Sequence, residues 1–185
     1  MFGNQKPFRN QLNKRVLIMK TTITTIFKNG IWLTIPPLLF SFSLMNYLPE
    51  ALTPATFNEN IPPILVMGEN IARIFVFGMP LFFSVGLSTR TQKRGLALYL
   101  VGIVLYYLSY LLLIWAPDTA WSNSLVGFAA PAYINIFWMS GLGLLGEKFY
   151  FPARLRYRPR FFIAPAIIFL IFHITHTVIV YYRHF

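Results

Sequence analysis

The stretch FFIAPAIIFLIFHITHTVIVYY, residues 161–182, decides the class of fold, because it contains no Lys, Arg, Asp or Glu. A helix needs about 20 mainly apolar residues to cross the hydrocarbon core of a bilayer. Lipid offers an open backbone no hydrogen-bond partner, so a crossing segment must be helical or belong to a closed barrel. The stretch therefore predicts a membrane-spanning helix.

Four further stretches share this apolar character, and they cover residues 31–48, 61–87, 96–116 and 124–146. A transmembrane barrel would instead show alternating segments of about ten residues. The composition agrees with helices in a membrane: 56% of the residues are apolar, 11% are charged and the mean hydropathy is +0.58. A soluble domain usually has about 25% charged residues. We predict an all-α integral membrane bundle of five transmembrane helices.

The connecting segments separate the charges. The chain has 16 Lys and Arg against 5 Asp and Glu. Nearly all of the basic residues lie in segments 1–30, 88–95 and 147–160, whereas 49–60 and 117–123 contain none. An excess of Lys and Arg marks cytoplasmic loops. The pattern therefore predicts a cytoplasmic N-terminus and an external C-terminus, in a multi-pass protein of the cell membrane (the inner membrane in a bacterium).

The predicted domains are a basic cytoplasmic segment, residues 1–30, and a transmembrane domain, residues 31–185. Residues 15–28, RVLIMKTTITTIFK, mix apolar and basic side chains. An amphipathic helix on the anionic inner leaflet would explain this mixture. A disordered basic tail that only fixes the orientation would explain it equally well, so both interpretations stay open.

Composition and context exclude several functions. Cysteine is absent, which excludes disulfides, thiolate catalysis, zinc–thiolate sites, iron–sulfur clusters and CxxCH haem attachment. The net charge of +11 follows from the charge rule for membrane loops, so nucleic acid is not an expected partner. GLGLLG at 141–146 has the spacing of a dinucleotide-binding loop, but it lies inside a predicted span, where small residues favour close helix contact.

The second span contains the polar residues Glu69, Asn70 and Arg73. Ionisable groups inside a membrane are expensive, and a central Arg costs roughly 2.5–3.5 kcal/mol on insertion scales. Glu69 and Arg73 are four residues apart and share a helix face, with the acid first, which is the favourable order. The pair is either a self-neutralising structural element or a charged site for an ionic group or a proton.

The fifth span contains His173 and His176, three residues apart and therefore on nearly the same face. Imidazole shuttles protons near neutral pH and also binds metals. We favour interhelical hydrogen bonding first, a proton or ligand role second, and a metal or haem last, because two His alone are a weak metal motif. No cofactor is implied by the sequence and no metal site is predicted.

Depth along the helices brings these groups to one level. At 1.5 Å per residue, Glu69 lies about 12 Å below the outer end of its span, and His173 about 14 Å and His176 about 9 Å below theirs. Similar counting places Tyr106, Tyr110 and Asn135 in the middle or outer half. We therefore predict a shared polar core, with the His-bearing face turned inward, because an unsatisfied polar group in hydrocarbon costs several kcal/mol. The candidate ligand or proton site is Glu69, Asn70, Arg73, His173, His176, Tyr106, Tyr110 and Asn135.

Two functions of different classes follow from such a core. The first is a small carrier or accessory subunit that handles protons or a small, lipid-like ligand, in the bilayer alone, as a homo-oligomer or with a membrane partner subunit. The second is an intramembrane enzyme acting on a lipid or isoprenoid substrate, with His173 or His176 as the acid–base group and Glu69 as its partner. The chain shows no nucleophile triad and no metal motif, so we favour the first.

Overall fold

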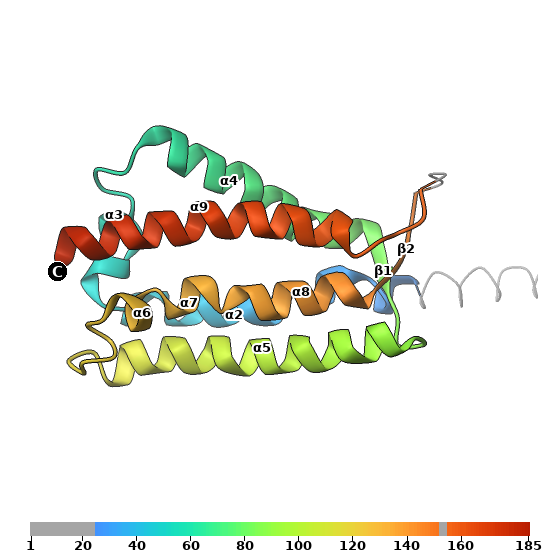
Figure 1. The fold of residues 1–185 in the computed structure, drawn as a ribbon, viewed down its shortest axis with the longest axis horizontal. Helices are drawn as coiled ribbons and strands as arrows, with labels where there is room; N and C mark the ends of the chain where they lie inside the picture. The colour runs from blue at the N-terminus through green and yellow to red at the C-terminus, as the bar shows by residue number, and fades with distance from the viewer. Residues whose placement is uncertain (1–24, 152–154) are drawn as a thin grey trace, which may run out of the picture.

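The fold is described from a computed structural model, which describes residues 25–151 and 155–185. The described part of the chain is mostly helical, with 74% of these residues in helices. Both interpretations of residues 15–28 fall largely outside the described residues. Figure 1 shows the helices side by side along one long axis, with α4 and α5 on opposite sides of the pair α8 and α9.

Three helices in the described residues are long and apolar enough to cross a membrane. The first is α4 (Pro63–Gly78), continued to Phe82 by a 3₁₀ turn (Met79–Phe82), and the others are α5 (Arg90–Trp115) and α9 (Arg160–His184). A capping box starts α5: the Thr89 side chain accepts from the backbone amide of Gln92, and the Gln92 side chain accepts from that of Thr89. These helices correspond to the second, third and fifth predicted spans.

The first and fourth predicted spans are helical in shorter pieces. Residues 31–48 contain a 3₁₀ turn (Gly30–Leu33), α2 (Ile35–Leu44) and a second turn (Met45–Tyr47). Residues 124–146 contain α6 (Leu125–Phe128), α7 (Ala130–Tyr133) and α8 (Asn135–Leu145). Proline explains the breaks in part, because it removes an amide donor and crowds the preceding turn. Between α2 and α4 lie a 3₁₀ turn (Glu50–Leu52) and the short helix α3 (Pro54–Phe57).

The second and fourth spans are predicted to be helical through residues 87 and 146, and these predictions are wrong for the C-terminal ends of both spans. A two-stranded antiparallel sheet occupies them, with β1 (Phe83–Val85) paired to β2 (Gly146–Phe149). Pro80 lacks the amide that would continue α4, and the strand pair satisfies backbone groups that the two helix ends would leave open. The phenol of Tyr157 covers this end of α8 and donates to the carbonyl of Gly143 at 2.8 Å. Sheet pairing here replaces the last helical turns.

Two glycines allow α5 and α8 to pack closely. A Cβ on Gly102 would lie 2.3 Å from the backbone nitrogen of Trp138, and one on Gly141 would lie 2.4 Å from that of Tyr99. Neither backbone can move away cheaply, so only glycine fits. The close approach predicted from the GLGLLG stretch therefore exists at Gly141.

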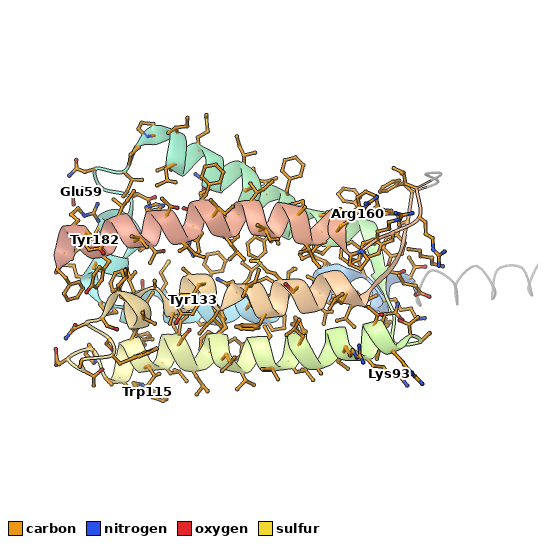
Figure 2. The ribbon with its side chains drawn as sticks, in the orientation of Figure 1. Glu59, Lys93, Trp115, Tyr133, Arg160 and Tyr182 are labelled. Atoms are coloured by element: carbon orange, nitrogen blue, oxygen red, sulfur yellow. The ribbon has the colours of Figure 1, made fainter. Side chains whose placement is uncertain are left out.

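The two ends of the bundle differ in charge. In Figure 2, Lys93 and Arg160 lie at one end, and Glu59, Trp115 and Tyr182 lie at the other. In Figure 1, α4 and α8 run in one direction along the bundle and α5 and α9 run in the other, so the connector 88–95 and the described residues of the connector 147–160 share the first end. The connectors 49–60 and 117–123 share the second end with the C-terminus. The folded chain thus keeps the basic and the acidic connectors apart.

Candidate functional site

The carboxylate of Glu69 is the centre of a polar cluster between α4 and α9. Its side chain is only 2% exposed. Arg73 reaches it from the next turn of α4 and donates to Oε1. His173 Nδ1 lies 3.0 Å from Oε1, and His176 Nδ1 lies 2.7 Å from Oε2. Three candidate side chains therefore meet at the carboxylate of Glu69, and the prediction that the two histidines face the bundle interior is confirmed.

Helix periodicity explains why these side chains meet. Residues three or four apart lie on one face of a helix. Glu69 and Arg73 therefore point the same way from α4, and His173 and His176 point the same way from α9. Asn70 adds a second acceptor beside Arg73, because its Oδ1 lies 3.3 Å from the Arg73 guanidinium. Three of the roughly four hydrogen-bonding positions of the Glu69 carboxylate therefore face Arg73, His173 and His176.

His176 is held at both ring nitrogens. Its Nε2 lies 2.9 Å from the backbone carbonyl of Phe57, and its ring stacks on the Phe57 ring with centroids 4.0 Å apart. A carbonyl oxygen only accepts, so Nε2 must hold a hydrogen. Nδ1 then either donates to ionised Glu69 or accepts from protonated Glu69. In both forms the pair shares one proton between Nδ1 and Oε2, and this proton is required by the observed contacts.

His173 differs from His176 in having a free nitrogen. Its ring packs parallel to Phe169, with centroids 5.2 Å apart, and Glu69 occupies Nδ1. Within the described residues, Nε2 of His173 has no hydrogen-bond partner, and the side chain is 22% exposed. The ring is therefore oriented by the carboxylate while one nitrogen remains available.

A cavity of about 310 Å³ adjoins the cluster. Seven of the eight candidate residues line it, and its other walls are mostly apolar side chains of α2, α3, α4, α8 and α9. The candidates on its wall are Glu69, Asn70, Arg73, Tyr106, Tyr110, Asn135 and His173. His176 does not line it and acts through Glu69 and Phe57 instead. A smaller cavity of about 130 Å³ shares Phe57, Tyr110 and His173.

Two further polar candidates on the cavity wall, Tyr106 and Asn135, form hydrogen bonds of their own. The Tyr106 hydroxyl lies 2.5 Å from the Ser41 hydroxyl of α2. The Asn135 amide donates to the Pro131 carbonyl at 2.8 Å, and its Oδ1 accepts from the Trp138 indole at 2.6 Å. These bonds satisfy the groups locally, so they border the cavity without joining the Glu69 cluster.

Sequence reasoning missed several wall residues, among them Ser41, Phe57, Trp138 and Phe169. Trp138 is three residues after Asn135, so its spacing placed it on the same face. The contribution of Phe57 to His176 is a main-chain carbonyl, which has no signature in a side-chain pattern. Among the described residues, no group of three or more His, Cys, Asp or Glu side chains is arranged to hold a metal ion.

The fold and the site define a mostly helical protein with three helices able to cross a membrane and a charged cluster beside a largely apolar cavity. Comparison with known protein families, curated proteins and solved structures finds no match. The geometry of the site is therefore the basis for a functional assignment.

Proposed function

We propose that the protein is a five-span membrane protein with its N-terminus in the cytoplasm. We also propose that its cavity binds a small, lipid-like ligand next to the proton that Glu69 and His176 share. It acts as a carrier or as the ligand-binding subunit of a membrane complex. The observation that supports this most is the position of Glu69, Arg73 and His173 on the wall of a largely apolar cavity.

The two interrupted segments are long enough to cross. At 1.5 Å per helical residue, residues 125–145 extend about 30 Å, close to the hydrocarbon thickness. Residues 30–47 reach a similar length, because their 3₁₀ turns rise about 2 Å per residue. The separation of Lys93 and Arg160 from Glu59 along the bundle supports a cytoplasmic first end.

The chemistry of the walls supports an amphipathic ligand. Side chains such as Leu38, Phe42 and Met139 offer apolar contacts, and the Glu69 cluster offers donors and a mobile proton at one place. Ligand sites commonly combine apolar walls with a few convergent polar groups that fix orientation. In a carrier, the shared proton of Glu69 and His176 would move with the ligand or be exchanged for it.

Native mass spectrometry of the protein extracted with its surrounding lipid tests this proposal. We expect a bound small molecule that is lost in Leu38→Trp, because the indole fills the cavity that Leu38 lines. Leu39→Trp is the matched control, since Leu39 is 61% exposed and lies outside the cavity. A chain without a bound molecule, or equal retention in both variants, would contradict a ligand in this cavity.

One observation favours the enzyme as a second candidate: His173 lines the cavity and is oriented by Glu69 through Nδ1, while its Nε2 has no hydrogen-bond partner among the described residues. A carboxylate that holds one imidazole nitrogen prepares the other for proton transfer. An enzyme would convert components of an added membrane lipid extract, and His173→Gln would abolish the conversion. Unchanged lipid profiles with the wild-type protein would leave binding or transport as the function.

A further inference from the structure

Counting protons gives the cluster a net positive charge. The Arg73 guanidinium is protonated at all relevant pH values. The contacts of His176 require one shared proton with Glu69, so that pair is neutral as a whole. His173 is neutral when its Nδ1–H donates to Glu69. The sum is one positive charge, and protonating His173 as well would only increase it.

The positive charge borders the cavity at Arg73. Glu69 is 2% exposed and fully engaged, whereas the Arg73 side chain is 46% exposed. Two of its N–H groups donate to Glu69 and Asn70, and a guanidinium has five. Unused donors of a cation therefore lie on the wall of the cavity, which apolar side chains of α2 such as Leu38 and Phe42 also line.

We infer that the cavity binds an amphiphile whose head group has a single negative charge, with the head on Arg73 and Asn70 and the apolar chain along α2. The inference rests on the proposed function and narrows its ligand class. An anion supplies the negative charge that balances the cluster. It also accepts hydrogen bonds from the free guanidinium N–H groups, whose geometry matches carboxylate and phosphate oxygens. A cationic head would meet repulsion from Arg73, and an uncharged head would leave its charge uncompensated.

Trp138 offers a direct probe, because it lines the cavity and is 1% exposed. Bromine quenches indole fluorescence only at contact distance. The full chain in mild detergent is titrated with an ω-brominated fatty acid, with the matching bromo-alcohol and with the matching bromoalkyl trimethylammonium. We expect quenching by the acid at concentrations at least tenfold lower than for the alcohol, and no quenching by the ammonium. Trp138→Phe removes the signal if it reports this cavity.

Variants of Arg73 and a second source of anion complete the experiment. Arg73→Met should weaken binding of the brominated fatty acid at least tenfold and leave binding of the bromo-alcohol unchanged. Arg73→Lys keeps the charge and should keep most of the affinity for the acid. Chain-brominated phosphatidylglycerol, compared with brominated phosphatidylcholine, separates a lipid phosphate from a free carboxylate. Quenching by phosphatidylglycerol alone assigns the phosphate, and quenching by the fatty acid alone assigns the carboxylate.

The possible failures are distinguishable. Equal quenching of Trp138 by acid, alcohol and ammonium in the wild-type chain would overturn the anionic head group and leave a lipid-like ligand in place. This comparison needs no variant, so a poorly folding Arg73→Met does not weaken it. Absence of quenching by every probe, together with no bound molecule in native mass spectra, would refute the ligand cavity itself.

Discussion

The contact between Glu69 and His176 can be measured by replacing both residues with Leu, singly and together. His176→Leu leaves Oε2 of Glu69 and the carbonyl of Phe57 without their partner. Each unsatisfied buried group costs roughly 1–3 kcal/mol. Interhelical hydrogen bonds in a membrane protein have measured nearer 0.6 kcal/mol on average and about 1.7 at most. We therefore expect His176→Leu to lower the free energy of unfolding by about 3 kcal/mol, which lies within the range that these two estimates give for two groups without a partner.

The coupling between the two residues is the more informative quantity. A hydrogen bond to a charged group contributes roughly 1.5–3 kcal/mol. The double variant should therefore be more stable than the sum of the single losses predicts, by about 2 kcal/mol. That difference corresponds to roughly a 30-fold change in the unfolding equilibrium, since 1.4 kcal/mol is a factor of ten. Glu69→Gln is the matched control, because its amide can donate to Nδ1 while His176 keeps its bond to Phe57.

The assay is equilibrium unfolding in mixed micelles, followed by far-ultraviolet circular dichroism as the mole fraction of dodecyl sulfate rises. All variants are measured at one pH, so that differences report the contact and not titration. Losses for Glu69→Leu and His176→Leu that add within about 0.5 kcal/mol would show that the residues are uncoupled. A Glu69→Gln variant as unstable as Glu69→Leu would refute the shared proton.

Three further predictions concern other parts of the chain. A reporter active only in the cytoplasm should work when fused after Arg160 and fail after Phe185; activity at the C-terminus would contradict the five-span orientation. Burial raises the pKa of Tyr157, so the folded chain binds more protons above pH about 10 and its stability falls as pH rises; Tyr157→Phe should flatten that fall in thermal melts. Gly141→Ala should lose about 1–3 kcal/mol by overpacking, measured by the same unfolding assay, whereas Gly78→Ala meets no atom within 4 Å and should lose none.

Much of the site could be predicted from the sequence because membrane insertion restricts where polar groups can lie. Glu69 and His173 are on different helices, yet counting from the span ends puts them at nearly the same depth. Buried polar groups must find partners in hydrocarbon, so their meeting followed from energetics. The spacing of Glu69 and Arg73 likewise indicated a shared face. These inferences needed only helix geometry and the bilayer.

What could not be predicted depends on contacts between distant parts of the chain. Phe83 pairs with Phe149 in the small sheet. Phe83 lies in a span whose apolar composition is equally typical of a helix, and Phe149 lies in the basic connector 147–160. Composition gives the length of an apolar segment but not the turn at which sheet pairing becomes more favourable. Phe57 belongs to a connector whose main-chain carbonyl serves His176. Backbone acceptors are present at every residue, so no pattern distinguishes this one.

A purely structural role for the cluster accounts for only part of it. A self-neutralising pair needs Glu69 and Arg73 alone, and such a pair would lower the cost of insertion by itself. The two histidines add no compensation for Arg73, since the proton that His176 requires restores a positive charge. A structural pair would also be enclosed, whereas Arg73 is 46% exposed and lines a cavity of about 310 Å³. Any anion bound there interacts with the charge that the shared proton creates.

Because coupling between two binding events is reciprocal, an anion bound at Arg73 would strengthen proton binding at Glu69 and His176, and the proton would strengthen binding of the anion to the same degree. Arg73, His173 and the carbonyl of Phe57 face this pair, and none of them is an acid that could replace the anion. The arrangement thus supports the proposed ligand site linked to a proton over a neutral pair that only stabilises the bundle.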